Sequence, residues 1–167
     1  MSKSNKQSNN KSNIVILGGG IVGLSTAWRL AERFPDQTIT LIEKESRLAF
    51  HQTGRNSGVL HSGIYYKPGT LRASNCRTGK EAMEAFCEEH EVAYEMCGKV
   101  IVAVDSSELP FLDTILDRGH ENGVTCEMIS KERLLELEPR VSGIQAIHVP
   151  EAGIVDYVGV CEKLGEL

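Results

Sequence analysis

Short apolar runs alternate with segments of helical periodicity along most of this chain. The run at 14–17 is rich in β-branched residues and too short for a helix, so it predicts a strand buried on both faces of a parallel sheet. From Ile21 to Phe34 apolar residues recur at helical spacing and Pro35 follows, which predicts an amphipathic helix. Its inward stripe is expected to comprise Ile21, Leu24, Ala27, Trp28 and Ala31. A second strand at 38–42 completes a predicted βαβ unit.

The rest of the chain predicts a mixture of helices and strands. Helices are expected at 70–90, 108–122 and 131–137, and from 157 onward. Strands are expected at 94–96, 99–104, 124–129 and 144–149. The helix at 70–90 is expected to bury a face that includes Gly79, Ala82, Met83 and Phe86. The overall prediction is an α/β fold with a Rossmann-like βαβ domain.

Glycines at fixed spacing follow the first strand. Gly18 permits a sharp turn, Gly20 lets the backbone approach a pyrophosphate, and Gly23 lets the next helix pack close to the strand. Glu43 ends the second strand, where a carboxylate accepts hydrogen bonds from adenosine ribose hydroxyls and repels a 2′-phosphate. Glycine clusters also form ordinary loops, but strand, glycines, helix, strand and acid in this order favour a site for FAD or NAD rather than NADP.

Composition excludes several other classes of protein. The 167 residues are 41% hydrophobic and 25% charged, enough for a core of ordinary size, and the net charge of −5 argues against a nucleic-acid partner. Five cysteines without CxxC spacing predict reduced thiols, with neither a disulfide framework nor a metal site. No apolar stretch approaches the length of a membrane span.

The first 13 residues, Met1–Asn13, are polar and are predicted to form a disordered leader. They have neither the apolar core of a signal peptide nor the arginine-rich pattern of a mitochondrial presequence. The prediction is a cytoplasmic protein, with peripheral attachment to a membrane left open.

Residues 44–66 form a long irregular segment dense in hydrogen-bonding side chains, which is typical of a functional loop. Within it, the string HQTGRNSGVLHSGIYYKPGTLRA begins at His51; ILGGGIVGLSTAWRL and LIEKE precede it, and CGKVIVAV and GIVDY follow it. Together these strings resemble the L-2-hydroxyglutarate dehydrogenase/oxidase family, FAD-dependent oxidoreductases of the D-amino-acid-oxidase type. The resemblance implies FAD rather than NAD.

Matching positions imply roles for individual residues. The residues implied to hold FAD are Gly18, Gly20, Gly23, Glu43, Thr53, Gly54, Asn56 and Ser57. His61 is the candidate catalytic base, and the alternative of a structural histidine that orders the loop stays open. Arg55 and Tyr65 are candidates for binding the substrate, although Tyr65 can also simply pack against its surroundings.

The other charged side chains and histidines are assigned less specific roles. Lys67, Arg72 and Arg77 are more often solvated charges than ligands of a dicarboxylate. Structural or surface roles are expected for His51, His90, His120 and His148.

The activity implied by the resemblance is oxidation of L-2-hydroxyglutarate to 2-oxoglutarate, with hydride transfer to flavin N5 and onward transfer of electrons to oxygen or a quinone. Three alternatives stay open. They are a related FAD enzyme that acts on glycerol 3-phosphate or an amino acid, a catalytically inactive N-terminal fragment, and an NAD-binding Rossmann enzyme.

The resemblance also implies a division into domains. Residues 14–92 are expected to begin the FAD-binding domain, 93–150 to start an inserted α+β substrate domain, and 151–167 to return to the FAD-binding domain. The chain stops within the returning helix, so it is expected to be the N-terminal portion of the family's length, to bind FAD weakly by itself and to turn over little.

Overall fold

The computed structural model describes residues 13–167, which fall into two compact units. Unit 1 comprises the described residues up to Asn56 together with Tyr157–Leu167, and unit 2 comprises Ser57–Asp156. The predicted leader lies outside the described residues except for Asn13, which is the first residue of a strand. The predicted domain boundaries after residues 92 and 150 concern the whole protein and stay a prediction.

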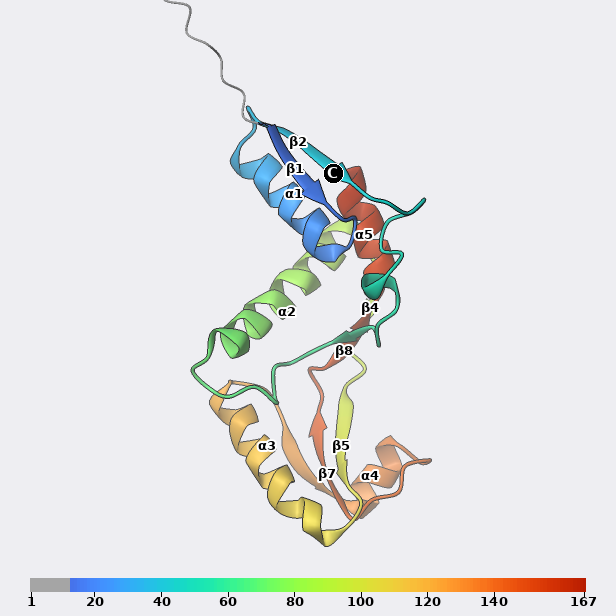
Figure 1. Cartoon of the computed structure of the whole chain (residues 1–167). Helices are drawn as coiled ribbons and strands as arrows, with labels where there is room; N and C mark the ends of the chain where they lie inside the picture. The colour runs from blue at the N-terminus through green and yellow to red at the C-terminus, as the bar shows by residue number, and fades with distance from the viewer. Residues whose placement is uncertain (1–12) are drawn as a thin grey trace, which may run out of the picture. The chain divides into compact units, whose positions relative to one another are not determined.

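Unit 1 is built on the predicted βαβ motif (Figure 1). Strands β1 (Asn13–Leu17) and β2 (Thr38–Ile42) pair in parallel, and helix α1 (Ile21–Arg33) connects them. Helix α5 (Tyr157–Glu166) packs against α1 and against the short 3₁₀ helix η1 (Gln52–Gly54). The buried apolar residues of unit 1 are Leu24, Ala49, Val160, Cys161 and Leu164.

The prediction that the first strand is buried on both faces is wrong for this structure. Val15 and Leu17 keep 56% and 79% of their surface exposed, and Ile42 on β2 keeps 52%. The described sheet of unit 1 has only two strands, and burial of both faces requires flanking strands and helices on either side. Of the stripe predicted on α1, Leu24 is buried, whereas Ala31 lies exposed near the end of the helix.

Unit 2 contains two antiparallel sheets. In one, β8 (Gly153–Val155) lies between β3 (Val59–Leu60) and β4 (Tyr94–Glu95). In the other, β7 (Gln145–Val149) lies between β5 (Lys99–Ala103) and β6 (Glu127–Ser130). The sequence did not predict β3 and β8, because two or three residues are too few to show a period. Strand β6 begins at Glu127, later than the predicted start at residue 124.

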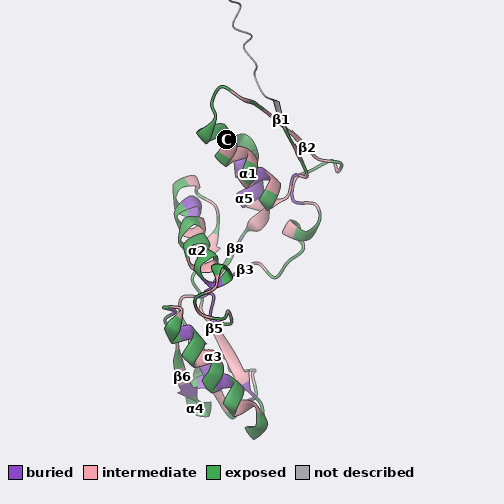
Figure 2. Ribbon diagram, turned by 60° about the vertical axis from the view of Figure 1, so that its left-hand side comes forward, coloured by how far each residue is buried: buried purple, intermediate pink, exposed green. Residues whose placement is uncertain are grey.

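The core of unit 2 is organised by alternation along β7. Ile147 and Val149, both fully buried, join the cluster beneath α3 (Leu109–Glu121), which also contains Leu112. Ala146 joins a smaller cluster with Leu134 of α4 (Lys131–Leu137). Since successive side chains of a strand point to opposite faces, β7 serves two cores at once. Figure 2 shows buried and exposed positions side by side along these elements.

Helix α2 (Leu71–His90) buries a different face from the predicted one. Phe86 is buried as expected, but Gly79 and Ala82 are exposed. The buried positions are Ala73, Lys80, Phe86 and Cys87. Lys80 fits this face because its ammonium pairs with Glu84 one turn later, at 2.5 Å. A short helix, η2 (Ser106–Glu108), precedes α3.

The structure also reports on thiols, metal ligands and membrane spans. All five cysteines are free thiols, and Cys87 and Cys161 are buried while Cys97 is exposed. Between residues 13 and 167 no group of three or more potential metal ligands comes together. Within the same range no helix combines the length and the apolarity needed to traverse a bilayer.

Ile147 offers a test of the core of unit 2. We expect Ile147→Ala to lower the free energy of unfolding by about 2–5 kcal/mol, because it removes a fully buried side chain and leaves a cavity. Ile144→Ala is the matched control, since Ile144 is 41% exposed and should cost under about 1 kcal/mol. Urea unfolding followed by circular dichroism measures both, and equal losses would contradict the packing described.

Candidate functional site

The glycine turn between β1 and α1 has the geometry that its spacing predicts. Gly18 adopts a φ of +108°, a conformation that L side chains rarely adopt, and its N–H donates to the carbonyl of Ile42 at 2.8 Å. A Cβ on Gly23 would collide with the carbonyl oxygen of Gly18. Only glycine at position 23 therefore allows α1 to start this close to the strand.

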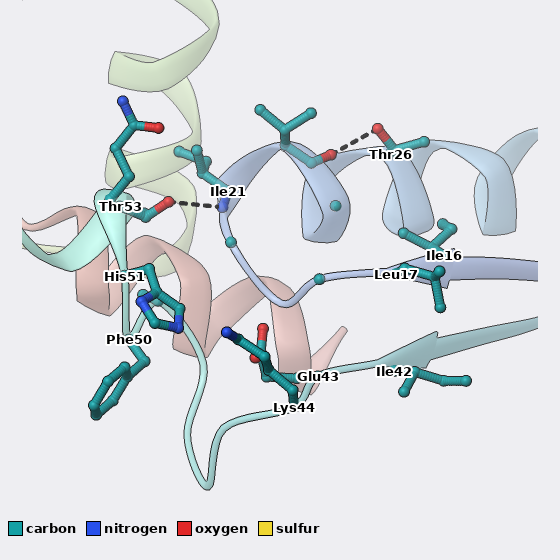
Figure 3. Close-up of a pocket in the computed structure, with 16 residues that line it drawn as sticks. Ile16, Leu17, Ile21, Thr26, Ile42, Glu43, Lys44, Phe50, His51 and Thr53 are labelled. Atoms are coloured by element: carbon teal, nitrogen blue, oxygen red, sulfur yellow. Dashed lines mark hydrogen bonds between the residues drawn. The ribbon is translucent and has the colours of Figure 1, made fainter.

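Thr53 contacts the start of α1. Its hydroxyl accepts a hydrogen bond from the N–H of Ile21 at 3.2 Å, which is drawn as a dashed line in Figure 3. A Cβ on Gly20 would lie 3.1 Å from the same oxygen, so the Thr53 side chain packs closely against the backbone of Gly20. The first N–H groups of a helix have no partner within the helix and attract anions. The start of α1 therefore presents donors where a pyrophosphate would be held.

Glu43 is fixed by backbone hydrogen bonds. One carboxylate oxygen accepts from the N–H of Glu45 at 2.9 Å, and the other accepts from Gly19 at 2.6 Å. These bonds, led by that from Glu45, lower the pKa of Glu43 below its ordinary value. Each oxygen of an ionised carboxylate has a further lone pair. Glu43 can therefore accept hydrogen bonds from ribose hydroxyls without losing those that hold it.

These residues line one groove of about 690 Å³ in unit 1 (Figure 3). Gly18, Gly20, Gly23, Glu43 and Thr53 are all on its wall, as the sequence predicts for a common site. Phe50, His51 and Lys44 also line the groove. His51 was assigned no specific role, but it lies 2.8 Å from a carboxylate oxygen of Glu45. The position of His51 within the irregular polar segment 44–66 is the sequence signal that could have identified it as a residue of the groove.

Gly54, Arg55 and Asn56 shape the segment after Thr53. A Cβ on Gly54 would collide with the carbonyl oxygen of Ala49, and the amide of Asn56 donates to the carbonyl of Thr53 at 2.7 Å. The guanidinium of Arg55 lies 5.0 Å from the centre of the Phe50 ring. Within unit 1, Arg55 thus contacts an aromatic ring of the groove wall.

The remaining predicted residues belong to unit 2. Ser57, the first residue of this unit, lines a shallow hollow with Tyr94 and Ile154. His61 and Tyr65 lie in the segment that follows β3. The boundary between the units falls between Asn56 and Ser57, so the groove belongs to unit 1 and His61 belongs to unit 2.

His61 has surroundings that favour the neutral imidazole. Although His61 is exposed, the partial loss of contact with water lowers its pKa first, and the nearby charge of Lys99 lowers it further. The carbonyl of His61 accepts a hydrogen bond from the thiol of Cys76 at 3.4 Å. Burial also raises the pKa of Tyr65, whose ring lies 4.4 Å from the ammonium of Lys99. The place of Lys99 is not evident from local sequence, where the available signal is a lone charge at the start of the apolar run KVIVA.

Arg77 corrects one expectation. It was expected to be a solvated charge, but it is partly buried, pairs with Glu151 and donates to the carbonyl of Ser62 at 3.3 Å. Lys67 and Arg72 are exposed, as expected. His90 contacts Phe86, His120 contacts Cys126, and His148 contacts Glu127. Structural or surface roles are expected for all three histidines.

Comparison with known proteins identifies the class. The model of the family "FAD dependent oxidoreductase" matches residues 13–167, and the chain belongs to this family. Its fold matches L-α-glycerophosphate oxidase from Mycoplasma pneumoniae, a structure with FAD bound, with a TM-score of 0.84 and 29% identity over 92% of this chain and 41% of that one. L-proline dehydrogenase from P. horikoshii shares the fold at 24% identity and a TM-score of 0.79.

Among curated proteins the similarity is more specific. The chain is 47% identical over 154 residues to L-2-hydroxyglutarate dehydrogenase of Indibacter alkaliphilus, covering 92% of this chain and 39% of the relative. Identity to the mitochondrial L-2-hydroxyglutarate dehydrogenase of Homo sapiens is 46% over 155 residues, covering 92% of this chain and 34% of the relative. The recognised resemblance is confirmed, and the chain spans little more than a third of the length of these relatives.

The groove in unit 1 fits the family's cofactor. A glycine turn without side chains, helix N–H groups and an ionised acceptor at the end of β2 match the pyrophosphate and ribose of FAD in chemical character. Together with the family match, this favours FAD over the NAD alternative.

Gly23 offers a test of the groove. We expect Gly23→Ala to weaken FAD binding by about tenfold or more, because the added Cβ displaces α1 from the turn. Quenching of flavin fluorescence measures the affinity. Gly79→Ala is the control, because Gly79 lies exposed on α2 with nothing within 4 Å of an added Cβ. Unchanged affinity in Gly23→Ala would contradict the assignment of the groove.

Proposed function

We propose that this chain is part of an FAD-dependent enzyme that oxidises L-2-hydroxyglutarate to 2-oxoglutarate. The observation that carries the proposal is 43–47% identity to three L-2-hydroxyglutarate dehydrogenases over nearly the whole described chain. The groove of unit 1, which suits a dinucleotide, and the lowered pKa of His61 in unit 2 support it.

In this proposal the groove residues hold the cofactor. Gly18, Gly20 and Gly23 admit the pyrophosphate, and Glu43 accepts from the ribose. Thr53, Gly54, Asn56 and Ser57 are proposed, from the family resemblance, to contact the cofactor between its phosphates and the flavin. Bound FAD supplies the hydride acceptor, flavin N5.

His61 is proposed as the general base. Oxidation at C2 of a 2-hydroxy acid requires removal of the hydroxyl proton as hydride leaves. A histidine accepts that proton only when neutral, and burial together with Lys99 favours the neutral form. Because its pKa lies below the ordinary 6.5, His61 should be unprotonated at pH 7. Tyr65 is proposed to contact the substrate.

Arg55 stays a proposed ligand of the dicarboxylate. Its guanidinium contacts the ring of Phe50, and a planar guanidinium suits a carboxylate. In the proposed enzyme the predicted FAD-binding domain begins with residues 14–92 and resumes at 151–167, and 93–150 begin the substrate domain.

The direct test is anaerobic reduction of the flavin. The protein is isolated from its cells at whatever length they contain, loaded with FAD and mixed with L-2-hydroxyglutarate. Loss of the oxidised flavin absorption supports the proposal. Bleaching by glycerol 3-phosphate or an amino acid instead would leave only the family assignment. No bleaching by any of them would favour the inactive fragment.

His61→Asn separates catalysis from cofactor binding. We expect flavin reduction to slow by about 10²–10⁴-fold while FAD binding stays unchanged, because only the proton acceptor is lost. For the wild type, the acid limb of the pH profile of kcat/KM should lie below pH 6.5, since the lowered pKa of His61 keeps the base form at lower pH. His120→Asn, an exposed histidine on α3, is the control. Reduction of His61→Asn at the wild-type rate would contradict the role.

A further inference from the structure

Lys99 carries an ammonium without a counter-ion. It is the first residue of β5, and none of the ion pairs among residues 13–167 includes it. Its Nζ instead lies 4.4 Å from the centre of the Tyr65 ring. Burial lowers the pKa of Lys99, while the neighbouring thiol of Cys76 acts in the opposite direction. A partly desolvated cation facing an aromatic ring attracts an anion more strongly than a solvated one.

Lys99 lies over the ring of Tyr65, which belongs to the same short segment as His61, and its charge lowers the pKa of His61. Three polar groups therefore gather in unit 2: an ammonium from β5, an imidazole from the end of β3 and a phenol from the segment between β3 and α2. None of the ion pairs among residues 13–167 joins a carboxylate to His61 or to Lys99. The cluster is thus complementary to a group that is itself negatively charged.

The backbone around this cluster is fixed by hydrogen bonds. The amide of Asn122 on α3 donates to the carbonyls of Tyr66 at 2.8 Å and Gly63 at 3.2 Å. Gly98 has a φ of +74°, and its N–H donates to the carbonyl of Ala152 at 2.8 Å, which sets the start of β5. The segment that carries His61 and Tyr65 and the strand that carries Lys99 are both held independently of any ligand.

Two other cations of unit 2, Arg77 and Arg118, already have hydrogen-bond partners. Arg77, next to Cys76 in the sequence, is engaged by Glu151 and by the carbonyl of Ser62. Arg118 donates to the carbonyl of Tyr65 at 3.4 Å. Lys99 is therefore the cation of this cluster whose ammonium can bind an anionic ligand.

We propose that Lys99 binds a carboxylate of the substrate, in a subsite that places the neighbouring hydroxyl beside His61 and one face of the ligand against Tyr65. An ammonium binds a carboxylate through charge-assisted hydrogen bonds, and the neutral imidazole beside it accepts a hydroxyl proton. This inference rests on the proposed function and deepens it, because it adds a substrate-binding residue that lies outside the conspicuous string beginning at His51.

The test uses the 167-residue chain without flavin, so that L-2-hydroxyglutarate binds and does not react. Nuclear magnetic resonance of the histidine ring signals follows the titration, and His61→Asn assigns the His61 signal. We expect a saturable shift of that signal and a higher pKa of His61 in the complex, because the bound carboxylate offsets the charge of Lys99. A merely structural lysine would not produce this rise.

Three variants sharpen the test. Lys99→Gln should weaken binding by about tenfold or more, the loss expected for one charge-assisted contact. Lys99→Arg keeps the charge and should retain most of the affinity. Lys131→Gln, at an exposed position on α4, is the matched control and should bind as the wild type does. The thermal unfolding of each variant is compared first, so that loss of fold is recognised.

Two results would overturn the inference: no saturable shift of His61 in the wild type, or equal affinity in Lys99→Gln. Tighter binding of glycerol 3-phosphate than of L-2-hydroxyglutarate would overturn its assignment to a carboxylate. Failure of the proposed function is recognised separately. If L-2-hydroxyglutarate binds at Lys99 but never reduces the flavin, only the proposed function fails. If L-2-hydroxyglutarate reduces the flavin of the Lys99→Gln variant with an unchanged KM, only this inference fails.

Discussion

The close approach of α1 to the carbonyl of Gly18, which only a glycine at position 23 permits, is the constraint on which unit 1 depends. It sets the start of the helix at the end of β1, where N–H groups that have no partner within the helix can meet an anion. The same turn places the N–H of Gly19 against Glu43, so the end of β2 is held beside the glycines. One steric requirement thus brings the phosphate donors and the ribose acceptor to the same edge of the sheet, which is the geometry that a dinucleotide needs.

Unit 2 depends on electrostatics rather than on close packing at its candidate site. Lys99 is partly buried and His61 is exposed, but both lose some contact with water, which makes the charged form of each less favourable. The charge of Lys99 also lowers the pKa of His61, because the two groups carry like charge when protonated. The imidazole loses its proton at a lower pH than the ammonium does, because its ordinary pKa is far lower. In the proposed function, the neutral imidazole would accept the hydroxyl proton and the cation would bind a carboxylate. Hydrogen bonds from Asn122 hold the intervening segment in place.

Local sequence patterns predicted the elements well and their surroundings poorly. The βαβ motif and the long helices follow from periodicity and glycine spacing, and all of them are present. The burial of Val15 and Leu17 was predicted wrongly, because burial depends on neighbouring strands that a local pattern does not contain. Strand β8 is short, and it forms a strand because it pairs with β3 and β4, which are far away in the sequence. Lys99 and Arg77 were missed or misjudged for the same reason, since their contacts with Tyr65 and Glu151 are long-range.

The central claim is that unit 1 recognises a dinucleotide through its pyrophosphate and adenosine ribose. Isothermal titration of the chain with FAD and with FMN tests it most directly, because the two share the flavin and only FAD carries the adenosine diphosphate half. The account predicts that FAD binds more tightly than FMN by about tenfold or more and that ADP competes with it. Equal affinity for FAD and FMN, or no competition by ADP, would contradict it.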